Sequence, residues 1–154
     1  ATFTVTLPAM DSLAVPRAAR SVRAAYEGGG RLTGRRVLVV EDEADARDLM
    51  SWALQQAGAD VIVATDGIEA LELLTADRLD VVLTDVQMPR MDGFRLLDAM
   101  RDRIAGLSPP TIAISARAGS DEATRARDAG FAAHLTKPVD LNLLLDTIDR
   151  VITA

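Results

Sequence analysis

The chain has 154 residues, a formal net charge of −6 and a hydrophobic content of 49%. This length suits one domain of ordinary size with a short appendage. The absence of cysteine excludes a disulfide framework and a thiolate metal site. No apolar run approaches the roughly 20 residues that span a bilayer, so we expect a cytoplasmic domain that makes no membrane contact.

The charge is distributed unevenly along the chain. Residues 1–36 contain six arginines and two acidic residues, whereas residues 37–154 carry a net charge of −10. Phosphate contacts need Lys and Arg, so an acidic domain is a poor nucleic-acid binder, and we expect no nucleic-acid partner. Of the 17 basic residues only Lys137 is a lysine, a compact ammonium on a flexible stem among rigid guanidinium groups.

The first 35 residues differ in pattern from the rest of the chain. Residues 1–8 alternate apolar residues with threonines, which is typical of a strand. Residues 9–35 are predicted to be a linker, within which residues 16–27 favour a helix that ends at three glycines. The linker therefore separates a short strand from the larger remainder of the chain.

From residue 36 onward, short apolar runs alternate with helical patterns. Strands are predicted at 37–40, 60–64, 81–84, 111–115 and 133–136, and helices at 44–57, 67–74, 94–103, 121–129 and from 141 to the end. Five strands alternating with five helices predict an α/β fold, in which a parallel sheet is covered on both faces.

The most informative stretch runs from Val81 to Gly93. An apolar strand ends in Asp85, and the breakers Met88-Pro89 and Asp92-Gly93 come after it. Open α/β sheets place chemistry at the carboxyl ends of their strands. A single aspartate there is more often a turn residue, so the assignment depends on what the other strands carry.

Three other predicted strands also end in polar residues. Glu41-Asp42-Glu43 follows the first strand, Ser115 ends the fourth, and Thr136-Lys137-Pro138 ends the fifth. If the strands are parallel, all of these residues meet Asp85. Clustered carboxylates demand a cation, and oxygen ligands suit Mg²⁺. A metal, an ammonium and a hydroxyl around a carboxylate nucleophile outline a phosphoryl-transfer site.

A structural explanation of the acidic run also exists. Acidic residues suit the first turn of a helix, because they complement the helix dipole. That explanation accounts well for Glu43 and less well for Glu41 and Asp42, which end the strand.

Together these segments resemble the receiver domain of two-component response regulators, over residues 36–154. The matching motifs are Val-Leu-Val-Val-Glu-Asp-Glu, Leu-Thr-Asp-Val-Gln-Met-Pro-Arg-Met-Asp-Gly, Ile-Ala-Ile-Ser-Ala, Ala-Gly-Phe-Ala-Ala-His-Leu and Thr-Lys-Pro. The resemblance implies a flavodoxin-like, doubly wound sheet of five parallel strands in the order 2-1-3-4-5, with five helices.

The resemblance also implies roles for the residues at the sheet edge. Asp85 would accept a phosphoryl group from phosphohistidine. Mg²⁺ would be ligated directly by Asp42 and Asp85, through water by Glu41, and by the backbone carbonyl of Gln87. The phosphoryl oxygens would be held by the Ser115 and Lys137 side chains and by the backbone N–H groups of Val86 and Ala116.

The same resemblance implies two further features. On phosphorylation Ser115 would move toward the phosphoryl group, and His134, where the family usually has Tyr or Phe, would swing inward. Gln87 and Arg117 would flank the phosphoryl group and tune its lifetime.

Residues 1–8 resemble the last strand of a histidine-kinase ATP-binding domain. This implies the receiver of a hybrid histidine kinase, whose partners would be the kinase domain and a histidine phosphotransfer protein. No output domain follows Ala154, so we expect output to pass to a partner or back to the kinase.

Three other functions have to be weighed. A Mg²⁺-dependent phosphohydrolase with an aspartyl nucleophile typically has a second Asp two residues later, where this chain has Gln87, which cannot act as a general acid or base. A flavodoxin-like flavin protein would need phosphate donors in the first loop, where Glu-Asp-Glu repels phosphate. An unphosphorylated docking domain would leave the pocket unused.

Overall fold

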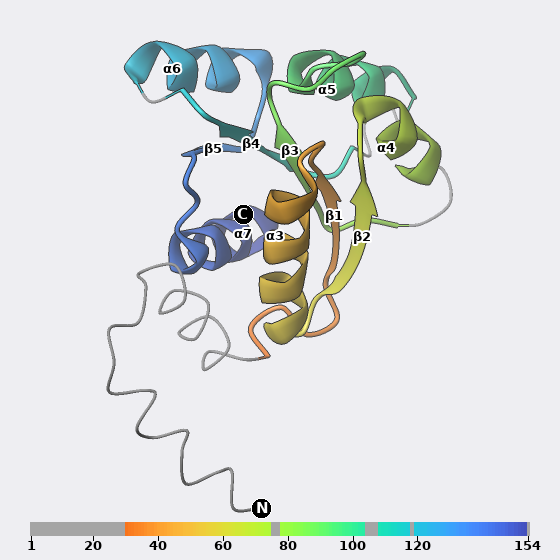
Figure 1. Cartoon of the computed structure of the whole chain (residues 1–154), viewed down its shortest axis with the longest axis vertical. Helices are drawn as coiled ribbons and strands as arrows, with labels where there is room; N and C mark the ends of the chain where they lie inside the picture. Colours follow the sequence, from red (N-terminus) through yellow and green to blue (C-terminus); the bar gives the residue numbers. More distant parts are fainter. Residues whose placement is uncertain (1–29, 75–77, 104–107, 118, 154) are drawn as a thin grey trace, which may run out of the picture.

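The structure is a computed structural model that describes residues 30–74, 78–103, 108–117 and 119–153. Strands and helices alternate through it (Figure 1): β1 (Arg36–Val40), α3 (Ala44–Gln56), β2 (Asp60–Ala64), α4 (Gly67–Leu74), β3 (Val81–Asp85), α5 (Gly93–Arg103), β4 (Thr111–Ser115), α6 (Ser120–Ala129), β5 (Ala133–Thr136) and α7 (Leu141–Thr153). The predicted strand at 1–8 and helix at 16–27 lie outside the described residues.

The five strands form one parallel sheet in the order β2-β1-β3-β4-β5. This confirms the predicted doubly wound, flavodoxin-like topology. After β1 the chain moves outward to β2 and then returns to place β3 on the other side of β1. The strand order therefore reverses between β1 and β3, and such a switch point leaves a crevice at the carboxyl ends of the two strands.

Helices cover both faces of the sheet, in two layers that Figure 1 shows on opposite sides of the strands. On one face α3 and α7 pack on Val37, Val39, Val81 and Leu83. On the other face α4 and α5 pack on Leu38, Val40 and Val82, and α5 and α6 enclose a smaller cluster around Phe131. Successive side chains of a strand point to opposite faces, so the central strands are apolar throughout.

Local sequence explains where several helices begin and end. The Asp140 carboxylate caps α7: it accepts N–H groups of the first turn, at 2.9 Å from Asn142 and 3.2 Å from Leu143. Asp92 caps α5 in the same way. Gly130 follows α6 with a φ of 105°, a left-handed conformation that glycine adopts without strain. None of the helices in the described ranges is long and apolar enough to cross a membrane.

The packed domain begins before β1. Leu32 is fully buried in the cluster between α3 and α7, and its N–H donates to the carbonyl of Ala57 at 2.9 Å. The Arg31 guanidinium forms ion pairs with Asp146 at 2.6 Å and Asp149 at 2.8 Å, both on α7. The last residues of the predicted linker are thus part of the folded unit.

We expect Leu32→Ala to lower the free energy of unfolding by about 2–5 kcal/mol, because it removes a fully buried side chain and leaves a cavity. Leu143→Ala is the matched control, since that leucine is 53% exposed on α7, and it should change stability by less than about 0.5 kcal/mol. Urea unfolding measures both. Equal effects would show that the segment before β1 is not part of the core.

Candidate functional site

The predicted site residues converge because the strand ends are in register. Val40 of β1 pairs with Thr84 of β3, and Asp85 pairs with Ile114 of β4. Ser115 in turn pairs with Thr136 of β5. The residues that end or follow these four strands therefore lie at one edge of the sheet.

Asp85 is held by contacts to both of its carboxylate oxygens. Oδ2 accepts a hydrogen bond from Nζ of Lys137 at 3.0 Å, and Oδ1 accepts the backbone N–H of Gln87 at 3.0 Å. The residue is only 5% exposed. Asp85 is therefore oriented from two sides at the end of a buried strand.

Glu41 lies beside Asp85 and is completely buried. Its Oε2 atom is 3.0 Å from Nζ of Lys137, in an ion pair that lacks hydrogen-bond geometry. Burial raises the pKa of Glu41 to about 7; the Lys137 ammonium opposes this rise and the Asp85 carboxylate adds to it. A buried carboxyl with so high a pKa is one that lacks sufficient positive charge nearby.

Lys137 is the cation that the two carboxylates share. Burial alone would lower its pKa, but the close contacts of the ammonium with the Glu41 and Asp85 carboxylates outweigh that effect, and the pKa is raised above its ordinary value. Lys137 therefore stays an ammonium at neutral pH, with both of its ion pairs at 3.0 Å.

The acidic residues at this edge also fit a divalent cation. Glu41, Asp42 and Asp85 each offer a carboxylate oxygen, and these oxygens all lie within 4.8 Å of one another. Asp42 is exposed, so an ion could keep water ligands on that side. A donor set made of oxygen alone, with room for water, is what Mg²⁺ prefers.

Ser115 and the nearby backbone define the opposite side of Asp85. The Ser115 side chain is buried, and its Oγ atom accepts the backbone N–H of Arg117 at 3.0 Å. The Val86 N–H donates to the Ile114 carbonyl at 2.9 Å. The N–H of Gln87 faces Asp85, and the roles of the Val86 and Ala116 N–H groups toward a phosphoryl group stay predictions.

His134 lies in β5, paired with Ala113 of β4. Its Nε2 atom is buried and has no hydrogen-bond partner among the described residues. The neighbouring strand position is filled by the small Ala113 side chain, which belongs to the cluster around Phe131. His134 is therefore paired with a residue of the apolar cluster between α5 and α6, and its predicted switching role stays a prediction.

Gly93 is a site residue whose role the sequence pattern did not reveal. An added Cβ there would lie 2.9 Å from the carbonyl oxygen of Asp85 and 3.0 Å from Cα of Val86. The Gly93 N–H also donates to the carbonyl of Val86 at 2.9 Å. Glycine therefore lets α5 begin directly against the strand end that carries Asp85. In the sequence, only the Asp92-Gly93 pair pointed to a special backbone requirement at this position.

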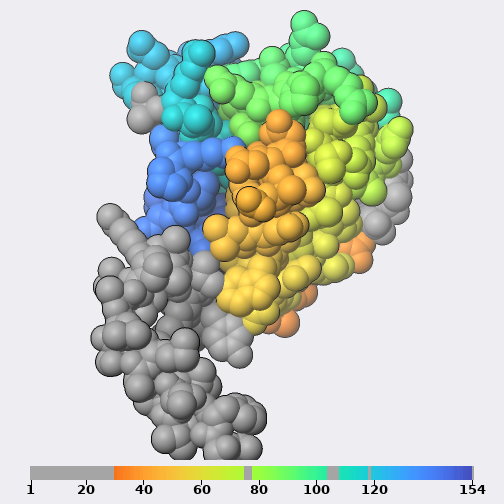
Figure 2. Space-filling view, viewed as in Figure 1, coloured from red at the N-terminus to blue at the C-terminus, as the bar shows by residue number. Residues whose placement is uncertain are grey.

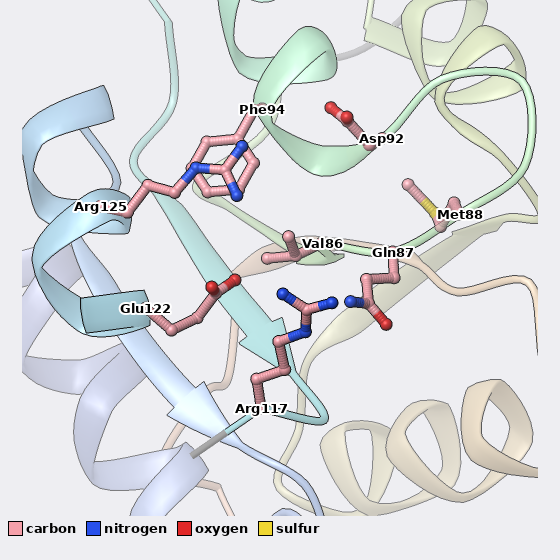
Figure 3. Close-up of a pocket in the computed structure, with 8 residues that line it drawn as sticks. All are labelled: Val86, Gln87, Met88, Asp92, Phe94, Arg117, Glu122 and Arg125. Atoms are coloured by element: carbon pink, nitrogen blue, oxygen red, sulfur yellow. The ribbon is translucent and has the colours of Figure 1, made fainter. Parts of the chain in front are cut away.

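A cavity of about 410 Å³ opens beside Asp85, between the β3–α5 loop and α6 (Figure 3). It is lined by Val86, Gln87, Met88, Asp92, Phe94, Arg117, Glu122 and Arg125. The Arg125 guanidinium lies 4.3 Å from the centre of the Phe94 ring, and Phe94 makes an edge-to-face contact with Phe131 at 5.4 Å. Sequence reasoning missed this cavity, because its lining comes from four separate segments.

Comparison with known proteins adds a family to this geometry. The family model of the response regulator receiver domain matches residues 37–149. The chain belongs to the response regulator receiver family. The match runs from the second residue of β1 into α7 and so includes all but one residue of the described sheet. The resemblance to receiver domains is confirmed.

Similar proteins and structures agree with this assignment. The chain is 38% identical over 112 residues to the sensor histidine kinase RcsC of Escherichia coli, covering 73% of this chain and 12% of RcsC. It is 42% identical over 104 residues to an uncharacterized 14.6 kDa protein of Leptolyngbya boryana, covering 68% of this chain and 79% of that protein. The first relative is therefore matched over only a small part of its length.

Two solved structures are similar in fold and sequence. The chemotaxis response regulator CheY4 of Vibrio cholerae superposes with a TM-score of 0.71 at 33% identity, over 76% of this chain and 98% of CheY4. A mutant receiver domain of the Arabidopsis thaliana histidine kinase CKI1 gives 0.71 at 32% identity, over 81% of this chain and 94% of that one. This protein is thus a receiver domain of two-component signal transduction.

Proposed function

We propose that this receiver domain takes a phosphoryl group from phosphohistidine onto Asp85 in a reaction that requires Mg²⁺. The observation that carries the proposal is the shared position of Lys137, whose ammonium contacts Asp85 and Glu41 at 3.0 Å while the oxygens of Glu41, Asp42 and Asp85 cluster within 4.8 Å. One fixed cation and three carboxylates leave an excess of negative charge, which suits a divalent ion.

In this proposal Asp42 and Asp85 ligate Mg²⁺ directly, Glu41 through water, and Gln87 through its backbone carbonyl. The bound ion supplies charge neutralisation for the phosphoryl oxygens. Ser115 and Lys137 hold the remaining phosphoryl oxygens, with backbone N–H groups beside them. The Asp85 carboxylate attacks phosphorus, the bond from phosphorus to the histidine nitrogen breaks, and its electron pair stays on the imidazole.

Similarity to receiver regions of histidine kinases supports a hybrid histidine kinase as the parent protein. The receiver is similar to part of a sensor histidine kinase and to a receiver domain of another histidine kinase. Residues 1–8 resemble the end of a kinase ATP-binding domain, but they lie outside the described residues. In such a protein the receiver would exchange phosphoryl groups with its kinase domain in the cytoplasm, where ATP is available, and with a histidine phosphotransfer protein.

The surface of α3 supports docking of a helical phosphotransfer partner. α3 begins three residues after Glu41 and exposes Leu49 and Trp52, one turn apart, at 45% and 42% of their surface. Figure 2 shows this helix on the front of the molecule, between α7 and the β2 edge of the sheet. An exposed apolar pair on a helix beside a reactive site suits packing against the apolar side of another helix.

We expect Trp52→Glu to slow phosphoryl transfer between the receiver and a histidine phosphotransfer protein by at least about tenfold, because aromatic anchors dominate such interfaces. Phosphorylation by a small phosphodonor should be unchanged. The matched control is Ile68→Glu on α4, which is equally exposed at 42% but lies on the opposite face of the sheet. Radiolabel transfer measures both reactions, and equal slowing by the two variants would contradict the docking assignment.

The phosphohydrolase alternative is not favoured. Gln87 occupies the position where such enzymes typically carry their general acid, and its backbone N–H is engaged with Asp85. Release of many phosphates per chain from a phosphomonoester would support that alternative, whereas uptake of one phosphoryl group per chain supports a receiver.

A further inference from the structure

The loop between β3 and α5, residues 87–92, is closed at its base by a hydrogen bond from the Gly93 N–H to the Val86 carbonyl at 2.9 Å. Its tip, residues 90–91, contacts the corner between β2 and α4. In the proposed function this loop supplies the Gln87 carbonyl to Mg²⁺. Contacts made at the tip can therefore affect where that carbonyl lies.

One contact of the tip is an ion pair between Arg90 and Asp66. The Arg90 guanidinium lies 3.4 Å from Oδ2 of Asp66, which is buried, whereas the arginine side chain is 70% exposed. The other carboxylate oxygen, Oδ1, accepts the backbone N–H of Glu69 at 2.8 Å and so caps α4. A single carboxylate thus joins the first turn of α4 to the loop.

The backbone of Arg90 shows that the tip is held in place. Its φ is 67°, a left-handed conformation that is unfavourable for an arginine. Such a conformation persists only where the surrounding contacts fix it. The ion pair with Asp66 is one of the contacts that do so.

The second contact of the tip is made by Met91, which lies against Gly67 at the start of α4. A Cβ added to Gly67 would lie 2.9 Å from Cγ and Sδ of Met91 and 3.0 Å from its Cβ. The Gly67 backbone is not left-handed, so the close approach of Met91 is what requires glycine there. Because the Cβ of Met91 cannot move without its backbone, a larger residue at position 67 would displace the loop.

We infer that Asp66 and Gly67 are positioning residues for the Mg²⁺ site, because they hold the tip of the β3–α5 loop and through it the Gln87 carbonyl. The inference rests on the proposed function of Asp85. Neither residue belongs to the carboxylate cluster that would ligate the ion, so both act through the loop. Coupling between two sites is reciprocal, so bound Mg²⁺ should in turn stabilise the first turn of α4.

Asparagine tests the ion pair without disturbing the backbone at either end. It is a good helix cap, and it adopts left-handed conformations more readily than most residues. Asp66→Asn and Arg90→Asn should each weaken Mg²⁺ binding about two- to fivefold, the range expected for a partly exposed ion pair. The double variant should bind Mg²⁺ no more weakly than the weaker single variant, because both changes remove the same contact.

The signs of these two effects separate positioning from long-range charge. Through charge alone, loss of the Asp66 carboxylate would weaken Mg²⁺ binding and loss of the Arg90 guanidinium would strengthen it. Positioning of the loop predicts weaker binding in both variants. The control is Asp60→Asn, which breaks the ion pair with Arg36 at the other end of β2 and should bind Mg²⁺ like the unaltered protein.

Gly67→Ala tests the contact with Met91. Its added Cβ should displace the loop and weaken Mg²⁺ binding at least about fivefold. Met91→Ala alone should also weaken binding, because the tip loses its packing. The combination of Gly67→Ala and Met91→Ala makes room for the new Cβ and should bind Mg²⁺ more tightly than either single variant.

The experiment uses the full chain, with isothermal titration of Mg²⁺ and amide hydrogen exchange of α4 with and without the ion. Mg²⁺ should slow exchange of the Glu69 N–H in the unaltered protein and slow it less in Arg90→Asn. Opposite effects of Asp66→Asn and Arg90→Asn on Mg²⁺ affinity, or unchanged affinity in Gly67→Ala, would overturn the inference. Mg²⁺ binding without phosphorylation of the unaltered protein would overturn the function of Asp85 alone, and absence of Mg²⁺ binding would overturn both.

Discussion

Replacing Asp85 with Asn is expected to reduce phosphorylation of this protein by at least about 100-fold with any donor. An amide is not a nucleophile under these conditions, and it keeps the size of the carboxylate, so the hydrogen bond from the Gln87 N–H is retained. Asn also removes one charge from a cluster of three carboxylates, which weakens any Mg²⁺ site. Intact-mass spectrometry after incubation with phosphoramidate and Mg²⁺ measures the effect.

The control for this variant is Asp48→Asn, which makes the same change at an exposed position on α3 outside the cluster. It should be phosphorylated at the rate of the unaltered protein. A phosphoryl group on the Asp85→Asn protein at a comparable rate would mean that another residue is the acceptor.

The second large effect is expected at Lys137, which is the only lysine of the chain. Lys137→Gln should lower the phosphorylation rate by about 100-fold, because it removes a partly buried charge that contacts Asp85 and faces the developing phosphoryl charge. Mg²⁺ affinity should be retained or increased, since the ammonium sits 3.0 Å from two of the clustered carboxylates and repels a second cation. Isothermal titration of Mg²⁺ and the phosphorylation assay together separate the two roles.

Lys137→Arg tests geometry apart from charge. Arginine keeps the positive charge but carries it on a larger planar group, which cannot occupy the space between Glu41 and Asp85 in the same way. We expect a rate between those of the unaltered protein and Lys137→Gln. Loss of Mg²⁺ binding in Lys137→Gln, with phosphorylation intact, would contradict the assignment of Lys137 to the phosphoryl group.

The fold could be predicted from the sequence because its central strands, β1, β3 and β4, are buried on both faces. Val81–Asp85 and Thr111–Ser115 are short apolar runs that stop abruptly at a polar residue, and the structure has strands with these bounds. Parallel pairing then brings strand ends together regardless of loop details. For the same reason the meeting of Asp85, Glu41 and Lys137 was predictable before any coordinates.

Other features depended on contacts that a linear pattern does not contain. Leu32 lies in a segment rich in glycine and arginine, and only the docking of that segment between α3 and α7 buries it. The hydrogen bond from the Val86 N–H to the Ile114 carbonyl also depends on how β3 and β4 pair beyond the apolar run. The cavity around Arg117 likewise exists only because α5 and α6 pack side by side, as Figure 1 shows.

The most direct test of the central claim locates the phosphoryl group chemically. An aspartyl phosphate is reduced by borohydride to homoserine, which marks the modified position in a peptide digest. After phosphorylation in the presence of Mg²⁺, homoserine should appear at position 85 alone, and omission of Mg²⁺ should abolish it. Phosphate retained on His134, or homoserine at position 42 in place of 85, would contradict the assignment of Asp85 as the acceptor.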